Sequence, residues 1–76
     1  MALPLYRAFG VAVRQARLDA GLSQEELGRR AGLHRAHMGE IERGETNATL
    51  ESVELIAKAL GVKSSDLVSQ AEAIQG

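Results

Sequence analysis

The sequence predicts a single all-α domain, a compact arrangement of five helices, and three features of the chain support this fold class. Apolar residues recur at steps of three and four rather than two, which is the period of an amphipathic helix. Glycines stand singly after the periodic segments, where a left-handed residue ends a helix. With 76 residues and no cysteine, the chain has length for one hydrophobic core and no disulfide scaffold.

The first two helices are predicted from an apolar stripe and from a capping pattern. Gly21 stands at the stop of the first helix, whose stripe consists of Leu5, Phe9, Ala12, Val13 and Ala16. Ser23 and Glu26 then form a capping box, in which the serine accepts from the third amide and the glutamate reaches back to the cap. A short second helix follows and ends at about Ala31, because Gly32 stops it.

Three more helices complete the prediction. The third starts near His34 and continues to Arg43, and Thr49 caps a fourth over residues 50–60. The fifth runs over about 66–74, with a serine just before Asp66, Ser64 or Ser65, as its cap. The side chains on the inward stripes are expected to be buried, and they are Phe9, Val13, Leu27, Ala31, Leu33, Met38, Ile41, Val53, Ile56 and Leu60.

Residues 24–43 carry the features of two helices joined by a tight turn at a steep angle. Gly28 lies inside a helix, where it costs ~1 kcal/mol relative to alanine, so we expect a packing reason for it. A residue without Cβ at this position lets the third helix approach closely. Gly32 in the turn provides a positive φ. Together with apolar anchors on both helices, these glycines indicate a DNA-binding helix-turn-helix.

Three stretches resemble the lambda-repressor-like helix-turn-helix family: LSQEELG at 22–28, AGL at 31–33 and IERG at 41–44. The likeness extends over roughly 11–62. In its size, with one domain and no effector module, the chain is similar to the controller proteins of restriction–modification systems. It is also similar to other stand-alone repressors and to small antitoxins. The resemblance implies a sequence-specific transcriptional regulator that binds double-stranded DNA. The absence of cysteine fits a protein of the reducing cytoplasm.

The resemblance also implies which residues meet DNA, since the third helix would lie in the major groove. Arg35 is suited to paired contacts with guanine, and Ala36 to a thymine methyl group. Gln24 is placed for a phosphate beside unpaired helix amides. His37 is either a donor to DNA or an inert exposed side chain. The full expected set adds two clamps on the sugar–phosphate backbone and consists of Gln24, Arg35, Ala36, His37, Arg43 and Asn47.

The net charge of −1 argues against a nucleic-acid partner, but the charges are unevenly distributed. Residues 1–43 hold seven arginines against five acidic residues, whereas residues 44–76 hold two lysines against five acidic residues. Arginine is suited to bidentate contacts with phosphates and bases. The front part is therefore compatible with a phosphate-binding face.

Other chemistries find less support in the sequence. His34 and His37 stand three residues apart, but no third ligand type clusters with them, so we expect no metal. The serines have no histidine–acid arrangement and no glycine loop cradles a phosphate, so we expect no enzyme and no cofactor. Glu42 is expected to pair with Arg14 or Arg17. No membrane or small-molecule partner is expected, and the alternative function is an antitoxin-like helical module that binds protein.

The working form is expected to be a homodimer on a palindromic site, because one recognition helix reads only a few base pairs. The fifth helix and one residue of the fourth supply more apolar surface than a lid over the core requires. The expected dimer interface consists of Leu55, Leu67, Val68, Ala71 and Ile74.

Overall fold

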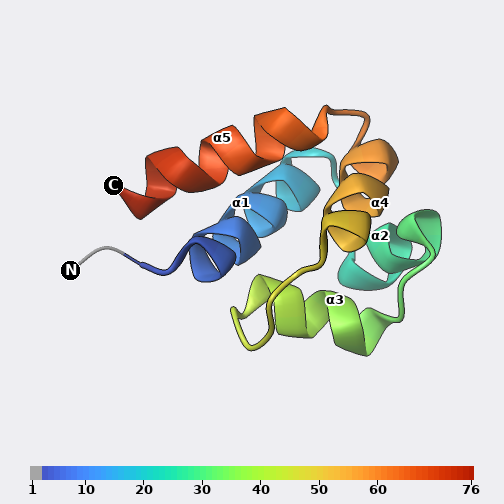
Figure 1. The fold of residues 1–76 in the computed structure, drawn as a ribbon. Coiled ribbons are helices and arrows are strands. Elements are labelled where there is room, and N and C mark those ends of the chain that lie inside the picture. Colours follow the sequence, from blue (N-terminus) through green and yellow to red (C-terminus); the bar gives the residue numbers. More distant parts are fainter. Residues whose placement is uncertain (1–2) are drawn as a thin grey trace.

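The computed structural model describes residues 3–76, which form five helices and no strand. The helices are α1 (Leu5–Asp19), α2 (Gln24–Ala31), α3 (Arg35–Glu42), α4 (Leu50–Leu60) and α5 (Ser64–Gln75). α1 packs along α5 on one side and against α3 on the other, while α2 packs against α3 and α4 (Figure 1). The all-α fold class predicted from the sequence is confirmed.

The helix starts follow the predicted caps, except at α5. Ser23 Oγ accepts a hydrogen bond from the Glu26 amide at 3.0 Å, and Thr49 Oγ1 accepts one from the Ser52 amide at 3.0 Å. The prediction of a serine cap for α5 was wrong, because Lys63 is the N-cap and Ser64 is the first helical residue. The Asp66 carboxylate accepts from the Lys63 amide at 3.4 Å, so the helix starts earlier than expected.

The core contains most of the side chains that the helical stripes predicted. Eight of the ten are buried, whereas Leu33 and Leu60 are half-buried against the core. Leu5 was placed on the stripe of the first helix but is 41% exposed, because it stands at the first turn of α1, beside a surface groove. Further core members are Ala8, Ala12, Leu22, Ala57, Leu67 and Ala71.

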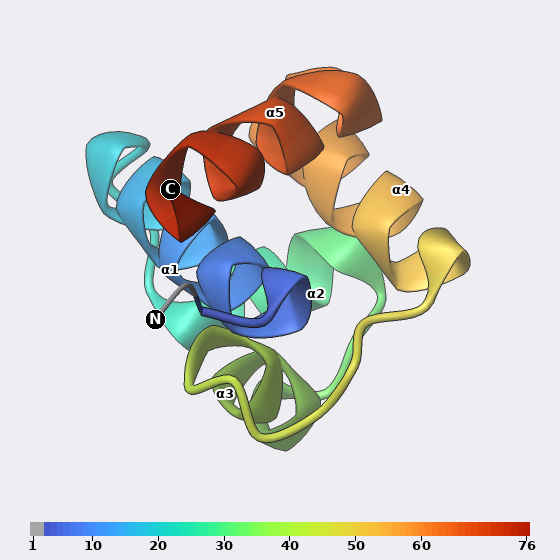
Figure 2. The ribbon, with the colours of Figure 1, turned by 60° about the vertical axis from the view of Figure 1, so that its left-hand side comes forward.

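Gly10 allows α1 to lie directly on the last turn of α3, and the sequence reasoning missed it. A Cβ on Gly10 would overlap the carbonyl oxygen of Ile41 and would stand 2.9 Å from that of Glu42. Only a residue without a side chain fits between the two helices at this point. Figure 2 shows the consequence, with α3 lying beneath α1 in this view.

Candidate nucleic-acid interface

The turn between α2 and α3 has the geometry that its glycines predicted. A Cβ on Gly28 would stand 2.7 Å from the Leu33 carbonyl oxygen and 3.2 Å from Met38 Cγ. Gly32 ends α2 with a φ of 71°, a value that side chains with a Cβ rarely adopt. The Leu33 amide then donates to the Gly28 carbonyl at 2.7 Å. The two helices are thus held in one fixed relation by backbone contacts.

A buried ion pair fixes the other end of α3. Arg17 of α1 donates from Nε and Nη2 to the two carboxylate oxygens of Glu42, at 2.7 and 3.0 Å. Its Nη1 donates to the Leu22 carbonyl at 2.8 Å. The hydrogen bonds to Glu42 raise the pKa of Arg17, although burial opposes the shift. Of the two partners expected for Glu42, the structure selects Arg17.

Gln24 joins this network from the start of α2. Its Nε2 donates to Glu42 Oε1 at 3.1 Å, which ties the first residue of α2 to the last residue of α3. The side chain is half-buried. Both helices of the motif are therefore anchored at the level of the Arg17–Glu42 pair, and Gln24 has a structural contact that the sequence did not predict.

The exposed end of α3 carries the residues expected to read bases. Arg35 and Ala36 are the first two residues of the helix, and both are exposed. The amides of this first turn have no partner inside the helix, which favours an anionic neighbour. His37 is half-buried, and its Nδ1 lies 3.5 Å from Glu40 Oε1. The structure brings these three side chains together at one end of the motif.

Arg43 and Asn47 lie beyond α3, in exposed positions. Arg43 donates from Nε and Nη2 to the two carboxylate oxygens of Glu45, at 2.9 and 3.1 Å. These hydrogen bonds lower the pKa of Glu45 and raise that of Arg43. The guanidinium also covers Gly39, since a Cβ there would stand 2.7 Å from Arg43 Nη1. Arg43 is therefore held along α3 by a carboxylate.

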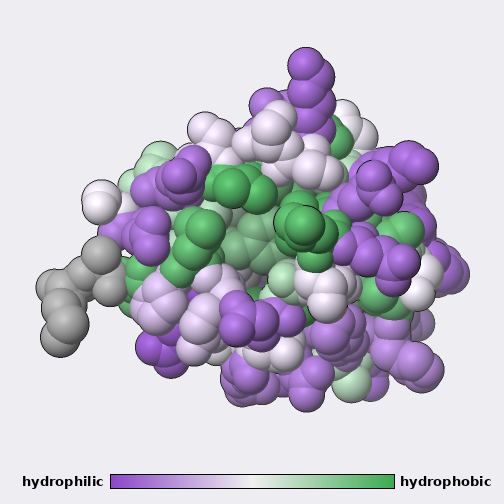
Figure 3. Space-filling view, viewed as in Figure 1, coloured by the Kyte–Doolittle hydropathy of each residue, from purple (hydrophilic) through white to green (hydrophobic). Residues whose placement is uncertain are grey.

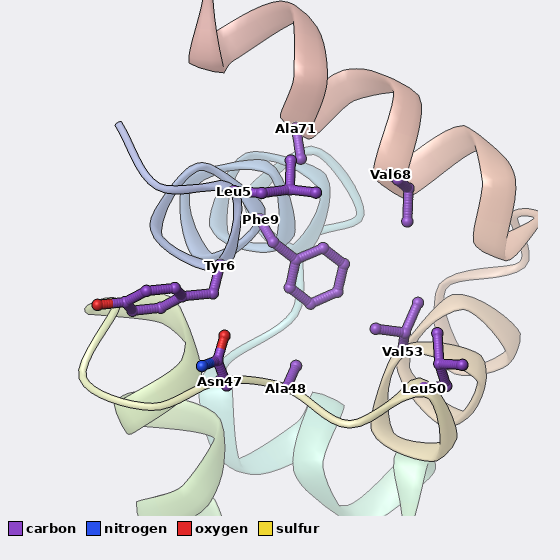
Figure 4. Close-up of a pocket in the computed structure, with 9 residues that line it drawn as sticks. All are labelled: Leu5, Tyr6, Phe9, Asn47, Ala48, Leu50, Val53, Val68 and Ala71. Atoms are coloured by element: carbon purple, nitrogen blue, oxygen red, sulfur yellow. The ribbon is translucent and has the colours of Figure 1, made fainter. Parts of the chain in front are cut away.

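A groove of about 270 Å³ adjoins this region, between α1, α4, α5 and the loop before α4. Figure 4 shows Phe9, Val53 and Val68 reaching it from three different helices, with Asn47 on the loop below. Leu50 also lines the groove and is 87% exposed. In Figure 3 the hydrophobic side chains gather over this face. It is an apolar surface next to the exposed part of the motif.

The structure corrects part of the expected dimer interface. Leu67 and Ala71 are 1% and 0% exposed, because α5 packs this side against α1. A second copy therefore cannot reach Leu67, while Ala71, although buried, still lines the apolar groove. The other three members are half-buried at the edge of the core, and they are Leu55, Val68 and Ile74.

Residues 3–76 offer neither a metal-binding cluster nor a membrane-spanning helix. No cluster of three or more histidine, aspartate or glutamate side chains has an arrangement that would hold a metal ion there. Within the same residues, none of the helices has the length and apolar character required to cross a membrane.

Comparison with known proteins places this geometry in a family. The helix-turn-helix family profile matches residues 13–67, which is more than half of the chain. The chain belongs to the lambda-repressor-like helix-turn-helix family. As a member of it, the chain is a DNA-binding transcription regulator of the helix-turn-helix type.

Relatives of similar size are regulators by name. The control protein C.BamHI of Bacillus amyloliquefaciens is 48% identical over 61 residues, covering 79% of this chain and 75% of the relative. The control protein C.SmaI of Serratia marcescens is 41% identical over 58 residues, covering 76% of this chain and 69% of the relative.

Solved structures agree with this assignment. The restriction–modification controller protein C.AhdI from Aeromonas hydrophila has a TM-score of 0.80 at 37% identity, covering 82% of this chain and 94% of that one. The clp gene regulator ClgR from C. glutamicum has a TM-score of 0.93 at 27% identity, covering 97% of this chain and 96% of that one.

Proposed function

We propose that the chain binds a palindromic operator as a homodimer and regulates transcription from it, in the manner of a controller protein. One observation carries the proposal. The buried Arg17–Glu42 pair and the glycine turn hold α3 rigidly, while Arg35 and Ala36 at its start stay exposed. A rigid helix with an exposed N-terminal turn fits the major groove, where the first residues of a recognition helix meet the base edges.

The positions of the remaining side chains support the following roles in this proposal. Arg35 reads guanine, with Ala36 against a thymine methyl group beside it. Gln24, Arg43 and Asn47 contact phosphates, which fixes the register without selecting a sequence. A half-buried His37 beside these residues adds a donor to DNA. Because these contacts displace counterions, operator binding weakens steeply as the salt concentration rises.

The apolar groove supports the homodimer. A two-fold interface pairs the same patch on both copies, so it must be self-complementary. Leu50 protrudes at the rim of a groove that is itself lined by Leu5, Phe9 and Val68. Leu50 of each copy would therefore enter the groove of the other. Since α3 lies at one edge of this face (Figure 1), a two-fold axis that lies in the face and runs toward that edge places both recognition helices on the same side.

The function is tested by selecting bound duplexes from a random pool and then measuring Arg35→Ala on the selected operator. We expect Arg35→Ala to cost about 1–3 kcal/mol of binding free energy and to relax the preference at one base pair per half-site. Gln24→Ala should weaken binding evenly across sequences. A pool without an enriched palindrome, or Arg35→Ala with unchanged affinity and preference, would contradict the proposed function.

A further inference from the structure

Both arginines expected to meet DNA are paired with carboxylates of the same chain. Arg35 Nη1 lies 3.3 Å from Glu25 Oε2, and Arg43 Nε lies 2.9 Å from Glu45 Oε2. A carboxylate this close offsets most of the charge of the guanidinium toward distant ions. The interface is therefore not a simple electropositive surface, and the acids on it require an explanation.

Stability does not explain the Glu25–Arg35 pair. The two side chains are 66% and 70% exposed, and ion pairs this exposed contribute little to folding. Glu25 stands in the first turn of α2, where an acid favours the helix dipole, but Glu26 already supplies the capping carboxylate there. Neither role requires Glu25 to reach across to α3.

The two pairs differ in the donors that they occupy. Arg43 donates from Nε and Nη2 to the two carboxylate oxygens of Glu45, so both donors on this edge of its guanidinium are already hydrogen-bonded. Arg35 uses only Nη1 on Glu25, and its guanidinium makes no other hydrogen bond or ion pair among residues 3–76. The Nε–Nη2 edge is the kind of fork that makes two parallel hydrogen bonds. Arg35 can therefore present this edge to a base while it remains paired with Glu25.

Guanine and phosphate respond differently to such a pairing. A phosphate attracts an arginine chiefly through the positive charge of the guanidinium. Glu25 offsets this positive charge on Arg35. The guanine edge is neutral and requires two donors in fixed directions, which Glu25 leaves in place and holds steady. The carboxylate of Glu25 thus weakens contacts with the DNA backbone at any sequence, while contacts with guanine are preserved.

We propose that Glu25 is a specificity-determining residue that suppresses binding to non-operator DNA by pairing with Arg35. The proposal rests on the proposed function and deepens it. Glu45 acts differently, since Arg43 must leave it to clamp a phosphate on any duplex. Glu25 therefore sets the ratio of operator to non-operator affinity, whereas Glu45 lowers both affinities together.

The test compares dissociation constants for two duplexes, the operator selected by the wild-type protein and a scrambled duplex of the same composition. Glu25→Gln should bind the scrambled duplex roughly fivefold more tightly, the scale of one exposed ion pair, and the operator less than twofold more tightly. Glu45→Gln should tighten both by one common factor. Glu72→Gln is the remote control, since Glu72 is exposed on α5 and forms no ion pair within residues 3–76.

A second measurement distinguishes an effect of the Glu25–Arg35 ion pair from an effect of the negative charge of Glu25 alone. In an Arg35→Ala background, Glu25→Gln should leave the affinity ratio unchanged, because Glu25 then has no arginine to hold. Glu25→Ala repeats the experiment with a second variant, and thermal unfolding checks that both fold. An unchanged ratio in Glu25→Gln, or a change that persists without Arg35, would overturn the inference alone. A wild-type protein without selective DNA binding would overturn the proposed function and the inference with it.

Discussion

Arg17 and Glu42 are each less than 10% exposed, at 8% and 7%, and they join α1 to the end of α3. Removing two charges from water is costly, and the geometry here offsets the cost through two short hydrogen bonds. Gln24 and the Leu22 carbonyl satisfy further polar atoms of the pair. No buried side-chain nitrogen or oxygen in residues 3–76 lacks a partner. The pair therefore fixes orientation more than it adds stability.

We predict that Glu42→Ala lowers the free energy of unfolding by about 3–5 kcal/mol, because Arg17 remains buried without its counter-charge. Urea denaturation followed by circular dichroism measures the change. The double variant Arg17→Met with Glu42→Leu is the control, since it removes both charges and should recover much of the loss. A loss below about 1 kcal/mol in Glu42→Ala would show that water reaches Arg17 and that the pair is not buried in solution.

At the scale of the element, α2 starts with a reciprocal cap. The Glu26 carboxylate accepts from the Ser23 amide at 3.0 Å, while Ser23 Oγ accepts from the Glu26 amide. The hydrogen bond from the Ser23 backbone lowers the pKa of Glu26 below its ordinary value of 4.5. This cap sets where α2 begins, and with it the positions of Gln24 and Glu25 on the proposed DNA-binding side.

The lowered pKa of Glu26 predicts an acid-dependent part of the stability. Since the folded state holds the carboxylate ionised, the contribution is complete above pH 4.5 and disappears as the pH falls through the lowered pKa. Glu26→Gln keeps an acceptor but does not titrate. Its melting temperature should be below that of the wild type at pH 7, and the two should converge in acid. Parallel melting curves from pH 7 to pH 3 would contradict the prediction.

At the scale of the whole molecule, the five helices leave one apolar face uncovered. Leu50 is the most exposed of the large hydrophobic side chains in residues 3–76, at 87%, and it borders the groove between α1, α4 and α5. A domain this small buries a limited share of its surface by itself, so association through this face would add to a marginal stability. The proposed dimer interface is therefore the face that the packing of α1 against α5 leaves uncovered.

We predict that Leu50→Asp prevents dimer formation and weakens operator binding, because a charge at this rim would be buried without a partner in the dimer. Sedimentation at micromolar concentration measures the mass, and titration with the full palindrome measures the affinity. Val68→Asp should also prevent dimer formation and weaken operator binding. The control is Leu18→Asp, a leucine on α1 that is 55% exposed and lies outside the groove. A wild-type monomer under these conditions, or an unchanged mass for Leu50→Asp, would rule out this interface.

The sequence by itself determined the helices, their caps and the turn, because these depend on neighbours a few residues apart. A glycine at 32, a serine at 23 and a threonine at 49 act through local backbone geometry, which periodicity and capping patterns describe. The family followed from the same short segments. The one misplaced cap, at α5, arose because Asp66 and the serines before it offered alternative starts within three residues.

Only the tertiary structure decided which faces remain open and which charges meet. Leu67 and Ala71 have the same apolar character as Val68, and the packing of α5 on α1 places them in the core. The sequence does not distinguish Gly10 from the other glycines of the chain, which has eight in all. Its role depends on Ile41, far along the chain, which lies against it in the fold. Glu25, which pairs with Arg35 of α3, likewise comes from a different helix, α2. Such contacts depend on how whole helices cross, a property that no local pattern of residues contains.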